Sequence, residues 1–159
     1  MTKIKPCLWF DREAEEAATF YTGLFPGGAI TALSRYGEGM PVPAGTVMLV
    51  EFSILGQDFQ ALNGGPHFTF TEAISMSVSC ADQAEVDRYW DALIADGGRA
   101  VQCGWLKDRF GLSWQIVPEM MTRLQVQGGP GVDRMMHAMM KMVKLDIQAL
   151  ERAYAGDDA

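Results

Sequence analysis

The chain has 159 residues, of which 48% are hydrophobic and 21% charged, and its formal net charge is −7. This composition is ordinary for a soluble globular protein. The negative charge argues against a nucleic-acid-binding surface, which needs clustered lysine and arginine. No run approaches the ~18 apolar residues of a membrane span. The N-terminal "MTKIKPCLWF" has no apolar signal segment, so we expect a cytoplasmic protein that binds neither nucleic acid nor membrane.

Length and cysteine content limit the organisation further. A chain of this size usually forms one domain and buries roughly 70% of its unfolded surface, so we expect a single domain over 1–159. Its cysteines are Cys7, Cys80 and Cys103. Because their number is odd and no CxxC pair occurs, neither a disulfide framework nor a structural zinc site is expected.

The first half of the chain predicts one helix among four strands. A strand over 4–10 is followed by a helix over about 13–24, in which alanines and Tyr21 recur at helical spacing. Three strands follow, over 29–36, 46–55 and 58–62. Gly56-Gln57 is the expected hairpin turn between the last two.

The second half predicts the same order of elements. A strand over 73–80 alternates serine with apolar residues, and Asp82 is well placed to cap a helix over 83–95. Three strands are expected at 99–103, 105–108 and 112–117, with Phe110-Gly111 in the last turn.

The two halves look like an internal repeat. "FYTGLFPGGAI" begins at Phe20 and "YWDALIADGGRAV" at Tyr89, an offset of about 70 residues. Each has an aromatic pair, then a leucine, then Gly-Gly. Chance is the alternative, because many helices end in glycine. We therefore expect βαβββ twice, as modules over 1–66 and 70–118, and a tail over 119–159 with a short helix near Met120, a "GGPG" break and a helix over 132–154.

Several long segments resemble one known family. They are "PCLWFDREAEEAATFYTGLFP", "FQALNGGPHFTFTEAISMSVSC", "DQAEVDRYWDAL", "QCGWLKDRFGLSWQIVP" and, in the tail, "MMKMVKLDIQALERAY". They resemble the PhnB-like branch of the vicinal oxygen chelate, or glyoxalase–bleomycin resistance, superfamily, whose members often carry the name 3-demethylubiquinone-9 3-methyltransferase. The resemblance implies an α+β fold in which two tandem βαβββ modules form a curved mixed sheet around a central cavity, plus a C-terminal helical tail.

The methyltransferase name finds no support in the residues. A Rossmann-like methyltransferase needs a glycine-rich turn directly after its first strand, within alternating strands and helices. Here the pairs Gly27-Gly28 and Gly97-Gly98 follow helices, and the strands come in hairpin groups. The sequence therefore does not predict that cofactor-binding cradle.

The resemblance also implies where a metal would bind. In metal-using members each half supplies two ligands, which together form a His/Gln/Glu set. The matching positions here are Pro6 (Cys7 if a gap is allowed), Phe59 or Gln60, Ala73, and Gln115. Pro and Ala cannot ligate, and the chain's only histidines, His67 and His137, lie outside these strands. We therefore expect no metal and no cofactor.

Strand alternation predicts a neutral pocket wall instead. Ser113, Gln115 and Val117 share one face of the last strand, while Trp114 lies on the other face, against the helices. Gln115 with Ser75 and Ser77 would form a hydrogen-bonding wall for a ligand. The alternative is that these groups satisfy one another or bound water.

Two further groups are candidate site residues. Asn63 and His67 bracket "NGGPH", a loop that could deliver Asn63 as a ligand contact and His67 as a catalytic acid or base to the cavity mouth. The alternative is turn chemistry. Trp105, Lys107 and Arg109 alternate, and Trp105 could grip a ligand, although a solvated sheet edge is the alternative. Cys103 is expected to be a packed thiol.

The tail contains a stripe of methionines that should cover apolar surface. They are Met135, Met136, Met139, Met140 and Met142. At helical spacing they would pack on the core or on a subunit partner, and the resemblance implies a homodimer.

Three functions remain open from the sequence. The protein binds a small organic molecule in a metal-free pocket; it is a metal-independent enzyme acting on a carbonyl or aromatic metabolite; or it has a structural or interaction role through the methionine-rich tail.

Overall fold

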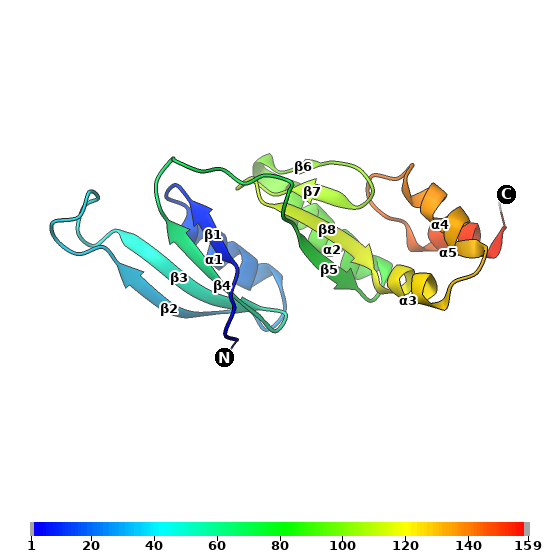
Figure 1. Cartoon of the computed structure of the whole chain (residues 1–159), viewed down its shortest axis with the longest axis horizontal. Helices are drawn as coiled ribbons and strands as arrows, with labels where there is room; N and C mark the ends of the chain where they lie inside the picture. The colour runs from blue at the N-terminus through cyan, green and yellow to red at the C-terminus, as the bar shows by residue number, and fades with distance from the viewer. Residues whose placement is uncertain (1, 158–159) are drawn as a thin grey trace. The chain divides into compact units, whose positions relative to one another are not determined.

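The computed structural model describes residues 2–157, which form two compact units divided between Phe70 and Thr71 (Figure 1). Each unit is described by itself, and the expectation of a single domain stays a prediction. No helix in the described residues is long and apolar enough to cross a membrane.

The N-terminal unit is one βαβββ module. Its elements are β1 (Cys7–Phe10), α1 (Ala14–Leu24), β2 (Ala29–Arg35), β3 (Val47–Ile54) and β4 (Gln57–Asn63). The sheet has the order β1-β4-β3-β2, with β1 parallel to β4 and the other pairs antiparallel.

The C-terminal unit repeats this arrangement and adds the tail. Its elements are β5 (Met76–Cys80), α2 (Gln83–Ile94), the short 3₁₀ turn η1 (Ala95–Gly97), β6 (Arg99–Ala100), β7 (Trp105–Lys107), β8 (Ser113–Pro118), α3 (Glu119–Gln127), α4 (Gly131–Met139) and α5 (Ile147–Ala155). The sheet order is β5-β8-β7-β6, with β5 parallel to β8. The predicted α+β class with two βαβββ modules and a helical tail is confirmed.

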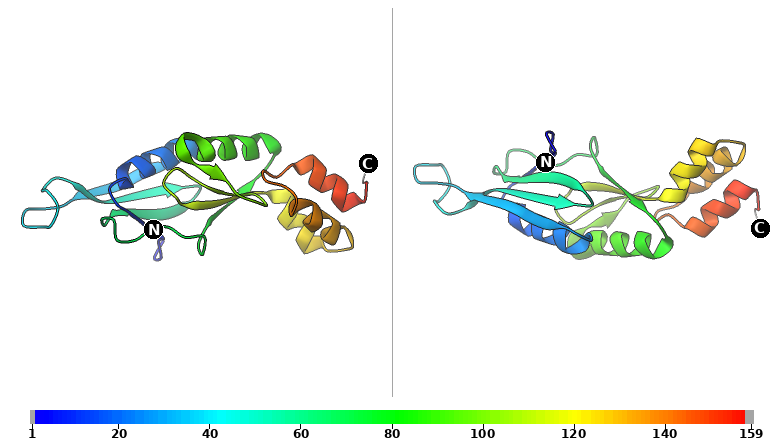
Figure 2. Two further views of the ribbon diagram at one scale, coloured as in Figure 1. Left: turned by 90° about the horizontal axis from the view of Figure 1, so that it is seen from above. Right: turned by 90° about the horizontal axis from the view of Figure 1, so that it is seen from below.

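One helix covers one face of each sheet (Figure 2). The buried side of α1 consists of Ala14, Ala17, Ala18 and Tyr21, and that of α2 of Val86, Tyr89, Trp90 and Leu93. Asp82 caps α2 as predicted, because its Oδ1 accepts the Glu85 N–H at 2.8 Å. The face of each sheet that points away from its helix carries the polar side chains described below.

Several element boundaries differ from the predictions for local reasons. The turn between β3 and β4 is Leu55-Gly56, both with positive φ, and not Gly56-Gln57. β6 ends at Ala100, because Cys103 and Gly104 both take left-handed backbone conformations. Ala73 lies in a turn before β5, which begins only at Met76.

The Gly-Gly pairs of the repeat have the same physical cause in both modules. Gly27 and Gly97 have φ of +71° and +110°, a region that favours glycine. The following glycine touches the end of the preceding helix. A Cβ on Gly28 would lie 2.5 Å from the Thr22 carbonyl oxygen, and one on Gly98 2.4 Å from that of Leu93. The repeat is therefore structural, and not a chance similarity.

The predicted single helix over 132–154 is wrong, because the tail breaks into α4 and α5. Asp146 begins α5 by accepting the Ala149 N–H at 2.8 Å. The segment between the helices is held by main-chain bonds, from Cys103 N–H to Met142 O and from Gly104 N–H to Val143 O. The sequence signal for the break was Asp146, an unrecognised N-cap.

The tail has an apolar core of its own, which uses the methionine stripe. Met135, Leu145 and Leu150 are fully buried there together with Met120 and Met121, while Met136, Met139 and Met142 pack against them. Met140 is 64% exposed. Most of the methionine stripe thus packs on an internal core, which was one of the two alternatives predicted from the sequence; the other was a subunit partner.

Gln83 on α2 attaches the tail to the second module. Its Oε1 accepts the Ile147 N–H at 2.8 Å, and its Nε2 donates to the Leu145 carbonyl at 3.1 Å. Lys144 adds an ion pair with Asp87 at 3.0 Å. The pKa of the Asp87 carboxyl is lowered by its hydrogen bond from Gln83 and then by Lys144.

Gln83→Ala is expected to loosen the tail. The change leaves the Ile147 N–H and the Leu145 carbonyl without their partner, at a cost of about 1–3 kcal/mol of unfolding free energy. Amide hydrogen exchange in α4 and α5 should accelerate, while exchange in β3 and β4 should not change. Gln102→Ala, at an exposed position, is the matched control. Unchanged exchange in α5 would show that Gln83 does not hold the tail.

Candidate functional site

Each module places a glutamine at the same point of its sheet. Gln60 lies in β4 and Gln115 in β8, the strands that pair in parallel with the first strand of each module. Their pairing partners in those first strands are Cys7 and Ser77, which are 70 positions apart and so repeat the offset seen in the sequence. The two glutamines are therefore structural equivalents, and the strand register selects Gln60, and not Phe59, of the two positions that the resemblance left open.

In the C-terminal unit the predicted residues do come together. Gln115 pairs with Ser77 on one side and with Trp105 on the other. Its Nε2 donates to Ser75 Oγ at 2.9 Å. Since paired residues share a face, all four lie on the side of the sheet away from α2. The alternative that these groups satisfy one another holds for the Gln115–Ser75 contact only.

Ser113 extends this face and was not predicted as a site residue. It lies two positions before Gln115, on the same face and about 7 Å along the strand. Ser113 is 1% exposed, and its Oγ has no hydrogen-bond partner in the described residues. Because this hydroxyl is closed off from solvent, a ligand on the surface of the sheet does not reach it in this structure. Strand alternation gave its face, but burial could not be read from the sequence.

Asp108 holds the hairpin that presents Gln115. Its Oδ1 accepts the backbone N–H groups of Phe110 and Leu112 at 2.9 and 3.0 Å, and its Oδ2 accepts Trp114 Nε1 at 2.9 Å. Asp108 and Trp114 are 3% and 2% exposed. Core packing of Trp114 is confirmed, and the indole N–H fixes the strand on its helix side while Gln115 points to the other side.

Lys107 and Arg109, the cations near this hairpin, both form ion pairs. The alternative that Trp105 and Lys107 lie on a solvated sheet edge is wrong. β7 lies between β8 and β6, so Trp105 and Lys107 are on an interior strand. Lys107 forms an ion pair with Glu72, and Arg109 lies 3.8 Å from Asp96. Both cations thus have acidic partners, while Arg99, which pairs with Lys107 in the sheet, adds a positive charge on β6 at the edge of this face.

The equivalent face of the N-terminal unit is charged. Gln60 pairs with Glu51, and Glu51 Oε1 accepts both Gln60 Nε2 at 3.0 Å and Lys5 Nζ at 3.2 Å. These bonds, that from Gln60 first, lower the pKa of the Glu51 carboxyl. Cys7 is exposed beside Gln60, and desolvation raises the pKa of its thiol, which disfavours a nucleophilic thiolate.

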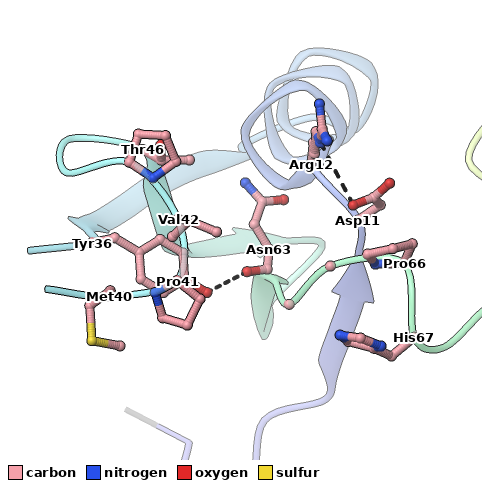
Figure 3. A pocket seen from close by; sticks show the side chains of 13 residues that line it. Asp11, Arg12, Tyr36, Met40, Pro41, Val42, Thr46, Asn63, Pro66 and His67 are labelled. Carbon is pink, nitrogen blue, oxygen red and sulfur yellow. Dashed lines mark hydrogen bonds and ion pairs between the residues drawn. The ribbon is translucent and has the colours of Figure 1, made fainter.

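Asn63 and His67 lie in the N-terminal unit, at a pocket of about 780 Å³ (Figure 3). The Asn63 amide is committed to the fold: Oδ1 accepts the Ala14 N–H at 2.9 Å and Nδ2 donates to Val47 O at 3.1 Å. Asn63 thus caps α1 and bonds to β3, and these contacts are not the turn chemistry within its own loop that the alternative supposed. Ligand contact by Asn63 and catalysis by His67 stay predictions.

The loop after Asn63 is fixed by Trp9. Trp9 Nε1 donates to the Gly65 carbonyl at 2.9 Å, and a Cβ on Gly64 would lie 2.3 Å from the indole ring. Gly65 has φ of +91°, and the exposed ring of His67 lies over it. Both glycines are therefore required by this loop, and the backbone that leads to His67 at the pocket is fixed by Trp9.

The side chains present do not fit the metal site of metal-using relatives. Among residues 2–157, no group of three or more His, Cys, Asp or Glu side chains could hold a metal ion. At the positions named above, Pro6 has only a main-chain carbonyl, which accepts the Gln60 N–H at 2.9 Å. Gln60 and Gln115 each donate to a neighbouring side chain, and two neutral amides are a poor donor set for a divalent ion.

The two βαβββ modules, each with a glutamine at the same point of its sheet, define the class of fold. The family described as 3-demethylubiquinone-9 3-methyltransferase matches residues 2–117. A PhnB protein from Bacillus cereus is 36% identical, with a TM-score of 0.67, and the match covers 74% of this chain and 99% of that one. The chain thus belongs to this family and is PhnB-like.

A second solved structure supports the fold alone. A protein from Pseudomonas aeruginosa is 24% identical, with a TM-score of 0.61, and the match covers 75% of this chain and 98% of that one. No curated protein matches the sequence. The family match ends at residue 117, so α3, α4 and α5 lie beyond it.

Proposed function

We propose that this PhnB-like protein binds a small organic molecule through the face formed by Ser75, Ser77, Gln115 and Trp105. The observation that carries the proposal is the Gln115 amide, which is only half-buried and lies on the same face as the exposed Ser77 and the half-buried Trp105. Its Nε2 donates to Ser75, while its oxygen accepts no hydrogen bond from the described residues and would take a ligand donor.

The chemistry of the face indicates an uncharged ligand. Its hydrogen-bonding groups are hydroxyls and an amide, and Trp105 offers half-buried aromatic surface beside them. The neighbouring Lys107 already pairs with Glu72. Because an uncharged amide and hydroxyls stabilise a ligand charge poorly, a neutral carbonyl or amide compound fits this face better than an anion.

Binding without turnover is the simplest form of this function. The enzymatic and structural hypotheses stay predictions, as do a homodimer and a cytoplasmic location. Methyl transfer is not proposed, since both Gly-Gly pairs are used to pack helix ends and neither follows a strand.

Gln115→Leu is expected to abolish or strongly weaken ligand binding. A neutral carbonyl-compound library is screened by thermal shift on the natural protein. Hits are then titrated against Gln115→Leu and against Gln127→Leu, a matched control at an exposed position of α3. Loss of one ligand hydrogen bond, with an unpaired polar group left behind, should weaken binding about 10- to 100-fold. Ser77→Ala, which removes an exposed hydroxyl from the same face, should weaken the same hits, and hits that bind all variants equally would exclude this face.

A further inference from the structure

We infer that the pocket of the N-terminal unit is a separate site, which takes a small planar aromatic molecule carrying a hydroxyl group. It is lined wholly by residues of that unit. Its volume of about 780 Å³ is within the range of small-molecule sites, roughly 300–1,000 Å³. Neither Gln115 nor any other residue of the proposed binding face contributes to its lining.

Apolar groups form two opposite walls of the pocket. Met40 and Pro41, from the loop between β2 and β3, lie on one side, and Pro66 and His67 lie on the other (Figure 3). Proline rings and an imidazole present flat surfaces. A planar ring placed against the second wall would gain offset stacking on the imidazole of His67.

The main chain that carries each wall is hydrogen-bonded before any ligand arrives. The loop between β2 and β3 is closed by bonds from Tyr36 N–H to Thr46 O at 2.8 Å and from Gly45 N–H to Tyr36 O at 2.9 Å. Arg35 Nη1 also donates to the Gly45 carbonyl at 3.0 Å. The opposite wall is fixed by Trp9 on Gly65. Binding would therefore order the exposed side chains of the walls, such as Met40, more than their backbone.

The polar groups of the pocket favour a hydroxyl over a charged group. Tyr36 donates its O–H to the Asn63 carbonyl at 2.6 Å, so the phenol oxygen remains as an acceptor. The Thr46 hydroxyl lines the same pocket. The charged residues at the rim, Asp11 and Arg12, have opposite signs and lie 3.9 Å apart, so they give the pocket no net charge. A ligand hydroxyl can donate to Tyr36, whereas an isolated ligand charge has no dedicated partner.

The two histidines of the chain give a direct test with p-cresol as the probe. Proton spectra of the full-length protein should show two imidazole C2–H signals, assigned with His67→Ala and His137→Ala. His137 lies exposed on α4, outside the pocket, and is the matched control. Titration with p-cresol to about 5 mM, a range suited to weak fragments, should shift the His67 signal saturably and leave His137 unchanged.

Two comparisons test the ligand class. 4-Methylcyclohexanol has the same substituents on a saturated ring, and it should bind about fivefold more weakly because it cannot stack. By ligand-observed relaxation, His67→Ala and Tyr36→Phe should each weaken p-cresol about fivefold, the expected loss of one stacking or hydrogen-bonding contact.

Several outcomes would overturn the inference. They are shifts of both histidines together, no shift of His67, equal binding of the two probes, or equal p-cresol binding to the natural protein and His67→Ala. If p-cresol binding were lost in Gln115→Leu and kept in His67→Ala, the separate pocket would be rejected while the proposed function stood.

Discussion

Asp108→Ala is expected to lower the free energy of unfolding by about 3–4 kcal/mol, because it removes a buried acceptor of several N–H groups. The Phe110 and Leu112 N–H groups and the Trp114 indole would lose their partner in a place with almost no solvent access. Urea denaturation followed by circular dichroism measures the loss.

Asp108→Asn distinguishes the contribution of the turn hydrogen bonds at Oδ1 from that of the Trp114 hydrogen bond at Oδ2. The asparagine oxygen can still accept the Phe110 and Leu112 N–H groups, but its amide NH₂ cannot accept Trp114 Nε1. We expect roughly half of the alanine effect, about 1.5–2 kcal/mol. If Asn and Ala destabilise equally, the Trp114 contact, and not the turn, dominates. If neither changes stability by more than about 0.5 kcal/mol, the hairpin does not depend on Asp108.

Gly28→Ala and Gly98→Ala are each expected to destabilise the protein by about 3 kcal/mol, because the new Cβ meets main-chain atoms that cannot turn aside. On Gly28 the nearest atoms are the Thr22 carbonyl oxygen at 2.5 Å and Cα at 2.6 Å. On Gly98 they are the Leu93 carbonyl oxygen at 2.4 Å and Ile94 Cα at 2.7 Å. The similar geometry predicts similar losses in the two modules.

Gly23→Ala is the control with the opposite sign. Gly23 lies inside α1, and a Cβ there has no atom within 4 Å, so helix propensity alone should stabilise the protein by about 0.5–1 kcal/mol. Thermal and urea unfolding of the three variants measures all of these effects. If the losses of unfolding free energy at Gly28 and Gly98 differ by more than about 2 kcal/mol, the two Gly-Gly pairs do not have equivalent structural roles.

Periodicity and turn residues were enough to predict the two βαβββ modules. The alternation of Ser77 with Val78, and of Gln115 with Ile116, gave the correct faces because one side of each sheet is buried. The helix spacing of Tyr21 and Tyr89 gave the correct cores for the same reason. Apolar periodicity and turn residues involve neighbouring positions only, so they can be recognised in a single sequence.

The features that sequence reasoning missed depend on contacts between distant residues. The choice between Phe59 and Gln60 as the counterpart of Gln115 is settled only by strand register, since one strand lies after a long hairpin and the other after short strands. The burial of Ser113 and the several bonds of Asp108 are also tertiary. The break before Asp146 was missed because the apolar spacing on both sides of it fits one long helix.

The repeated Gly-Gly pairs have a consequence for how the two modules could diverge. On the helix side of each sheet, main-chain contact at Gly28 and Gly98 leaves almost no choice of residue. On the opposite side, the same strand positions hold Glu51 beside Gln60 in one module and Trp105 beside Gln115 in the other. In a repeated module of this kind, the surface packed on the helix tolerates few substitutions, whereas the opposite face of the sheet tolerates many. The two modules can therefore differ in the charge of that opposite face without any change of fold.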